Sequence, residues 1–460
     1  MNILPIHVAL LVTTAPQLDN INNPNFLINQ ESSRSKRVRT SIEVSLDNGL
    51  LEVLLSNVGE DLLSEILARL PNCRCVIQLS SVCRRWHALI SQPQFIPSFI
   101  RLHRDRDQSY TILFHMNYTS NIYETPEYFQ LVCTLFSEES LLIHGGKHAL
   151  SSSNYLDFMP SLMVVRASCN DLLLVSPDKR FFDGRFRHHH QRYYICNPVT
   201  KKWFLVPKET PIGTRAGFAL ICNKNSYKVV LLDVFSLADK EATVIVDIYK
   251  QPLWVFCSES GKWTRSFFLL PARPTRDYLF VTNVVSCNGI LYWMDGSVNL
   301  DRIVSLDLAN NRCVVIYFPD IVRENTTIGN PDSRVYICAV RDELRLLHFL
   351  RIGPDTKCFV VRVWELDRWD GPWSLVGERE LMFSDAVSAD GGRDTVVAAV
   401  FHPKDCDSVF VICGKSVYEC GVSKDTCRKL GELGEFIGHE GLASYVLMHP
   451  AWPTPIPFGV

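Results

Sequence analysis

The stretch Cys196-Asn-Pro-Val-Thr-Lys-Lys-Trp203 leaves a strand-like run, passes through a polar turn and ends on an aromatic residue. Four later stretches repeat this scheme and end on an aromatic residue or a cysteine, at residues 257–263, 307–313, 364–373 and 420–427. The ends of successive stretches are 50 to 60 residues apart. This period is typical of one four-stranded blade of a β-propeller of the kelch size class.

A second repeated phrase supports the same period. Ala167-Ser-Cys-Asn-Asp-Leu-Leu-Leu174 and Val285-Ser-Cys-Asn-Gly-Ile-Leu-Tyr292 lie 118 residues apart, which is close to two periods. From Tyr110 onward, short runs of Val, Ile, Phe and Tyr are broken by clusters of Asn, Asp, Gly and Pro, as in strands joined by turns. The pattern predicts a propeller-like all-β domain of about six blades, with strands from both ends available to close the ring. Residues 110–165 are ambiguous within this pattern.

The segment from Gly59 to His103 has helical spacing instead. Five apolar residues fall on one helix face before Pro71, which ends that helix: Leu62, Leu63, Ile66, Leu67 and Leu70. A second helical stretch follows, with another shared face: Val82, Trp86, Leu89 and Ile90. A module of roughly 45 residues cannot enclose so many apolar side chains by itself. Either the β domain or another protein must cover the surplus.

Several phrases of both regions resemble known families. Val58-Gly-Glu-Asp-Leu-Leu-Ser-Glu-Ile-Leu-Ala-Arg-Leu-Pro71, with residues 79–86 and 89–95, resembles an F-box. The β region resembles the F-box-associated domain of plant kelch-type F-box proteins through phrases at residues 169–173, 197–203, 227–230, 258–263, 401–403 and 450–457. The resemblance implies an α+β multidomain chain with a small all-α F-box (55–103) and a propeller-like substrate-recognition domain (104–458). The segment before them is rich in Asn, Ser and Pro, which predicts a disordered leader (1–54).

The resemblance also implies a function. An F-box binds a Skp-type adaptor and through it a cullin scaffold, so the chain would be the non-catalytic substrate-recognition subunit of an SCF-type ubiquitin ligase. The adaptor-binding positions carry over onto Val58, Leu62, Ile66, Leu67, Leu70, Pro71, Val82, Trp86 and Leu89. Packing inside the module is the alternative role for each of them, above all for Leu67 and Leu89. The family usually opens with Leu-Pro where this chain has Val58-Gly59, which removes a preset backbone angle.

Composition narrows the functions further. The 47 Lys and Arg against 49 Asp and Glu give a net charge of −2, so no overall field favours nucleic acid or an anionic membrane. Most of the 16 cysteines lie singly in apolar runs, which is typical of small buried side chains in a reducing compartment. We therefore expect a cytoplasmic or nuclear protein. The basic run at residues 34–39 is either a nuclear-import signal or a solvated charge cluster.

Enzyme motifs are weak. The chain lacks a Gly-x-Ser-x-Gly elbow, and Gly414-Lys-Ser416 lacks the first glycine of a phosphate loop. Cys73 and Cys75 have no second metal-spaced pair, and the histidines at residues 188–190 are adjacent on a basic loop. We expect no cofactor and no metal. Two other functions stay open: an interaction scaffold outside any ligase, and a propeller enzyme acting on sugars or by oxidation.

Overall fold

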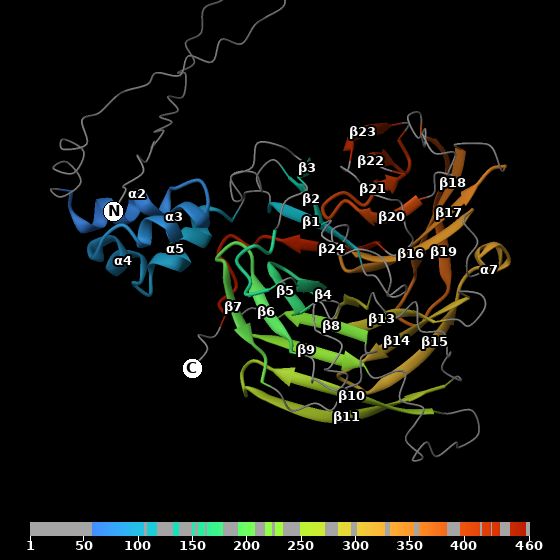
Figure 1. Ribbon diagram of the computed structural model, residues 1–460, viewed down its shortest axis with the longest axis horizontal. Helices are drawn as coiled ribbons and strands as arrows, with labels where there is room; N and C mark the ends of the chain where they lie inside the picture. Colours follow the sequence, from blue (N-terminus) through green and yellow to red (C-terminus); the bar gives the residue numbers. More distant parts are fainter. Residues whose placement is uncertain are drawn as a thin grey trace, which may run out of the picture. The chain divides into compact units, whose positions relative to one another are not determined.

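The computed structural model describes residues 58–104, 108–116, 132–137, 150–151, 155–161, 163–177, 192–207, 217–222, 226–232, 249–271, 284–295, 301–326, 332–353, 358–383, 396–414, 416–424, 426–432 and 442–456. The predicted leader, its basic run and the histidines at residues 188–190 lie outside the described residues. Two regular parts follow each other along the rest of the chain, first helices and then sheets (Figure 1).

The helical module, residues 58–104, contains four helices: α2 (Glu60–Ala68), α3 (Cys73–Ser80), α4 (Arg84–Ile90) and α5 (Phe95–Leu102). The apolar series from Val76 to Ile90 is divided between two helices, α3 and α4. The hydroxyls of Ser80 and Ser81 donate back to the carbonyls of the preceding turn, at 2.6 and 2.7 Å, and α3 ends there. Cys83 then caps α4, its sulfur accepting from the backbone N–H of Trp86.

The helical module has an apolar core, against which Trp452 near the C-terminus also packs. Nine buried apolar residues from all four helices make it up: Leu63, Leu67, Ala68, Cys73, Val76, Leu89, Ile90, Phe95 and Phe99. The ring of His103 joins the end of α5 to the end of α2, because its Nδ1 lies 2.9 Å from the carbonyl oxygen of Phe99 and its Nε2 lies 2.8 Å from that of Leu70. The two ring nitrogens thus lie beside one carbonyl in the last turn of α5 and one carbonyl just beyond α2.

The described β residues form six four-stranded sheets. Five are built of strands that are consecutive in the chain. They are β4–β7 (Met163–Cys169, Leu172–Pro177, Tyr194–Asn197, Lys202–Leu205) and β8–β11 (Gly217–Cys222, Tyr227–Leu232, Tyr249–Cys257, Lys262–Leu270). Next come β12–β15 (Val285–Cys287, Ile290–Asp295, Arg302–Asp307, Arg312–Tyr317), then β16–β19 (Ser333–Val340, Glu343–Arg351, Cys358–Leu366, Trp373–Met382) and β20–β23 (Val396–Phe401, Ser408–Cys413, Ser416–Gly421, Cys427–Glu432). A short helix, α7 (Asp320–Asn325), follows β15.

The sixth sheet combines both ends of the β region. Strand β24 (Leu442–Met448) pairs antiparallel with β1 (Tyr110–Met116), and β2 (Val132–Phe136) and β3 (Leu150–Ser151) complete the sheet. The first strands of the other five sheets, β4, β8, β12, β16 and β20, contact one another in turn, and β24 contacts both β20 and β4. The strands therefore form a closed ring, and the predicted class, a small helical module followed by an all-β propeller, is confirmed (Figure 1).

Each of the two repeated phrases of the sequence occupies the same turn in every sheet where it occurs. All five polar turn phrases join the third strand of a sheet to its fourth, as β6 to β7 and β22 to β23. The Ser-Cys-Asn phrases join a first strand to a second, and Asn170 and Asn288 there have φ of 50° and 51°. Asparagine tolerates this left-handed conformation better than most residues, which explains its recurrence. The ambiguous residues 110–165 supply β1 to β3.

The cysteines behave mainly as expected. Most are free, and several of the free ones are buried, as Cys196 and Cys413 are. The exception is Cys420, which forms a disulfide with Cys427 directly opposite it on the neighbouring strand. The expectation applies to most of the cysteines and does not cover this pair, whose side chains the hairpin register places face to face.

Candidate functional site

Helix α2 has two apolar stripes with opposite environments. Leu63 and Leu67 face the core and are 1% and 2% exposed, whereas Leu62 and Ile66 are 56% and 44% exposed. Residues four apart lie on the same side of a helix, so each pair forms a stripe one turn long. A nine-residue helix that leaves such a stripe uncovered carries more apolar surface than its own module buries.

Other predicted adaptor-binding positions are also accessible. Val82, in the turn between α3 and α4, is 52% exposed. Pro71 is exposed, and Val58, Leu70 and Trp86 are half-buried. We call Leu62, Ile66 and Val82 the exposed apolar set, because these three predicted residues are large aliphatic side chains left open to solvent.

Two predicted positions do not belong to a surface. Leu67 and Leu89 are each 2% exposed and lie in the core of the helical module. Their assignment to adaptor binding is corrected here, since a partner cannot contact side chains that α2 and α4 already bury against each other and their neighbours. The alternative role in packing inside the module applies to both.

The Val58-Gly59 departure leaves the start of α2 intact. Gly59 is the N-cap of the helix with φ −58°, close to the angle that a proline ring would impose, and its carbonyl accepts from Leu63 N at 3.0 Å. Glu60 and Asp61 occupy the first turn, where negative charge interacts favourably with the helix dipole. The missing proline therefore changes how strongly this backbone angle is preset, not the angle itself.

The exposed surface of the module extends beyond the predicted residues. Ile100 and Leu102 on α5 are 42% and 46% exposed. The sequence does not single out these two residues, because the chain beyond Pro93 has too few turns for a clear helical period. Glu65 on α2 forms an exposed ion pair with Arg69, with the carboxylate oxygen 2.7 Å from the guanidinium nitrogen. An exposed pair of this kind adds little to stability.

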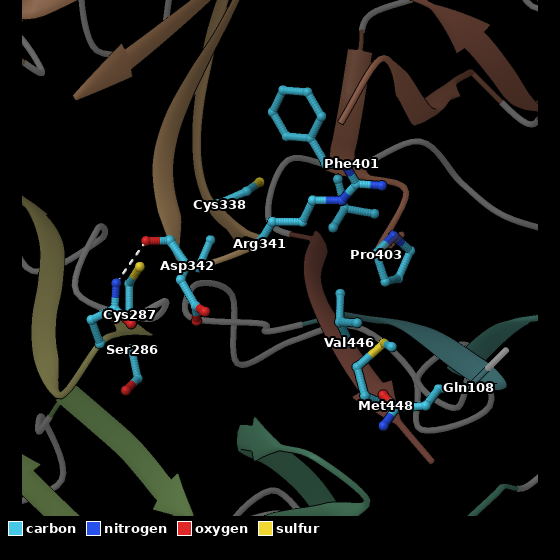
Figure 2. A pocket seen from close by; sticks show the side chains of 13 residues that line it. Gln108, Ser286, Cys287, Cys338, Arg341, Asp342, Phe401, Pro403, Val446 and Met448 are labelled. Atoms are coloured by element: carbon cyan, nitrogen blue, oxygen red, sulfur yellow. Dashed lines mark hydrogen bonds between the residues drawn. The ribbon is translucent and has the colours of Figure 1, made fainter. Parts of the chain in front are cut away.

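Among the described residues, the propeller contains a hollow that the sequence did not predict. A pocket of about 400 Å³ lies at the ends of β12, β16, β20 and β24 (Figure 2). Its lining is Gln108, Ser286, Cys287, Asn288, Cys338, Ala339, Arg341, Asp342, Val400, Phe401, Pro403, Val446 and Met448. These residues come from four sheets, so no single stretch of sequence marks the site.

The polar wall of this pocket is ordered by its own hydrogen bonds. Asn288 donates from Nδ2 to the carbonyl oxygen of Asp342 at 2.8 Å, and Arg341 donates to the carbonyl oxygen of Lys404. Burial raises the pKa of Cys287 to about 11 and that of Cys338 to about 12. Both thiols are therefore protonated at neutral pH and are poor nucleophiles. The pocket can offer hydrogen bonds and an apolar wall to a ligand.

The described part of the chain contains neither a metal-binding cluster nor a membrane-spanning helix. Within the described ranges, no group of three or more His, Cys, Asp or Glu side chains is arranged to hold a metal ion. Among the helices of that same part of the chain, none is both long and apolar enough to cross a membrane.

Known proteins match both parts of the chain. Residues 55–97 match the F-box domain, and residues 147–423 match the beta-propeller of the F-box protein At3g26010-like family. F-box protein At1g49990 from Arabidopsis thaliana is 25% identical over 335 residues, which cover 68% of this chain and 74% of that protein. F-box protein At3g28330 from the same plant is 25% identical over 344 residues, covering 70% and 74%.

A solved structure, YCF48 from Cyanidioschyzon merolae, covers 74% of this chain and 96% of its own with a TM-score of 0.34 and 10% identity, a likeness too low to bear on function. By contrast, the F-box match falls on the helical module, and the propeller match spans the strands from β3 to β22. The chain belongs to the family of F-box proteins that carry an At3g26010-like beta-propeller.

Proposed function

We propose that this protein is the substrate-recognition subunit of an SCF-type ubiquitin ligase. The F-box binds a Skp-type adaptor, the adaptor joins it to a cullin scaffold, and the propeller binds the target protein. The observation that carries this proposal is the exposed apolar set, Leu62, Ile66 and Val82, on a module whose core is already filled by other residues. Apolar side chains left open in this way are typical of a surface that a second protein covers.

The proposed role needs no acid, base or nucleophile from this chain. By holding a target lysine near a charged conjugating enzyme, a receptor raises the effective concentration of the two reacting groups. The protonated thiols of the propeller pocket fit a binding role. A cytoplasmic or nuclear location, where such a ligase acts, is part of the proposal.

Co-purification of the full chain tests the proposal against the two alternatives. We expect the chain, expressed with an affinity tag, to recover both a Skp-type adaptor and a cullin. Recovery of the adaptor without a cullin would favour an interaction scaffold outside any ligase. Recovery of neither, together with turnover of a sugar or an oxidisable compound, would favour a propeller enzyme and contradict the proposal.

A further inference from the structure

The end of the chain is anchored to the propeller through a buried carboxylate. Asp171 is fully buried and follows Asn170 in the first Ser-Cys-Asn phrase. Its carboxylate accepts from the backbone N–H of Thr454 at 2.9 Å, from the Thr454 hydroxyl at 2.6 Å and from Nδ2 of Asn197 at 2.6 Å. A carboxylate buried without partners would be costly, so these three bonds offset its desolvation and hold Thr454 in place.

Asn197 strengthens the same anchor. Its Oδ1 accepts from the backbone N–H groups of Val199 and Thr200, at 2.9 and 3.2 Å, which fixes how the amide is oriented. Its Nδ2 therefore points to Asp171 and also lies 3.3 Å from the carbonyl oxygen of Thr454. Two residues of the repeated sequence phrases, Asp171 and Asn197, thus hold one C-terminal residue that is 283 positions away from Asp171.

Two residues before Thr454, the chain contacts the F-box. The ring of Trp452 packs edge-on against Phe95 and Phe99 of α5, with centroids 6.3 and 5.5 Å apart. Both phenylalanines are 1% exposed. Edge-to-face pairs of this kind add to the apolar burial of the rings.

The contact continues toward the adaptor-binding helix. Phe99 stacks on His103 with centroids 4.0 Å apart, and the His103 ring bonds the carbonyl of Leu70, just beyond the end of α2. An unbroken series of contacts therefore runs from Thr454 on the propeller through Trp452 and α5 to the end of α2.

We infer that residues 452–454 form a C-terminal clamp, which fixes the F-box helices at one position on the propeller. Trp452 holds the helices, Thr454 holds the propeller, and Pro453 between them is buried and has a restricted backbone. Resting on the proposed function, the clamp sets the distance between the adaptor and the bound target. Trp452 and Thr454 are positioning residues, because neither contacts a reacting group.

Distance measurement between two spin labels tests the clamp. One nitroxide is placed at Gln78, exposed on α3, and the other at Lys228, exposed on β9, both through a non-canonical amino acid so that the cysteines stay unchanged. We expect one narrow distance distribution in the wild type and a clearly broader one in Trp452→Ala. Trp452→Phe keeps a ring against α5 and is expected to restore most of the narrowness.

Controls separate the clamp from general destabilisation. Trp203 is an aromatic residue of the same type, 42% exposed on β7 and far from α5 in the chain, so Trp203→Ala should leave the distribution narrow. Thr454→Val removes only the hydroxyl bond to Asp171 and serves as a milder variant if Trp452→Ala does not fold. A Trp452→Ala or Thr454→Val distribution as narrow as that of the wild type would overturn the inference.

The same variants keep the clamp distinct from the proposed function. Trp452 is not part of the exposed apolar set, so Trp452→Ala should bind the adaptor with a dissociation constant within about twofold of the wild type. Broadened distances with unchanged adaptor affinity are the expected combination. If the wild type bound no adaptor, the proposed function would fail while the distance result still decided the clamp.

Discussion

The exposed apolar set can be tested by removing its side chains without disturbing the helices. Leu62, Ile66 and Val82 are 56%, 44% and 52% exposed in the free protein, so about half of each side chain remains for a partner to bury. Full burial of such a side chain is worth about 1.5–3 kcal/mol, and half of it about 1 kcal/mol. We expect the triple alanine variant to lose about 3 kcal/mol of adaptor binding, or roughly a hundredfold in Kd.

The assay is calorimetric titration of the purified Skp-type adaptor into the chain, with circular dichroism to verify that the helices are retained. Alanine is the best helix former, so α2 itself should not be weakened by the substitutions at Leu62 and Ile66. Leu269 on β11 is a matched control, because it is also 56% exposed but lies on the propeller. Leu269→Ala should leave Kd unchanged. A folded triple variant that binds within about threefold of the wild type would refute the reasoning.

The remaining predictions concern stability. Burial lowers the pKa of His348 and His449 to about 4, so below pH 6.5 the unfolded chain binds more protons at these residues than the folded chain does. The free energy of unfolding should therefore fall by about 2 kcal/mol per histidine between pH 7 and pH 5. In urea titrations, the His348→Gln variant should show a smaller fall than the wild type over this range. Gly421→Ala would place a Cβ 2.8 Å from Thr426 Oγ1 and 2.9 Å from the backbone oxygen of Lys424. Because both distances are too short, we expect the free energy of unfolding to fall by about 1–3 kcal/mol, as followed by thermal unfolding. An unchanged melting temperature would contradict this prediction. Asn72→Ala removes the cap that accepts from Cys75 N at 2.9 Å and should cost about 1 kcal/mol by the same measurement, with Asn72→Ser as the control that keeps a cap.

The fold class and the local turn chemistry could be predicted from the sequence. Asn170 and Asn288 recur because equivalent hairpins need the same left-handed backbone, and this need is visible in the sequence at fixed spacing. The pairing of β24 with β1 is different, since nothing in residues 442–448 specifies a partner more than 300 positions earlier. Only ring closure, a property of the whole domain, indicates it.

In the helical module too, one part of the structure could be predicted from the sequence and another could not. Helical periodicity brought Leu62 and Leu63 together with Ile66 and Leu67 as one broad apolar face, but it could not tell which stripe the other helices cover. The contacts of α2 with α4 and α5 decide that, and they place Leu67 inside. The propeller pocket and the C-terminal clamp could not be predicted for a related reason, because each joins residues from distant parts of the chain.

Side-chain footprinting of the chain with and without adaptor tests the central claim most directly. Hydroxyl radicals oxidise accessible side chains, so Leu62 and Ile66 should react readily in the free protein and be protected at saturating adaptor, while Leu269 reacts equally in both samples. Leu62 and Ile66 that stay as reactive in the saturated sample as in the free protein would show that the adaptor does not cover this stripe, and would contradict the account.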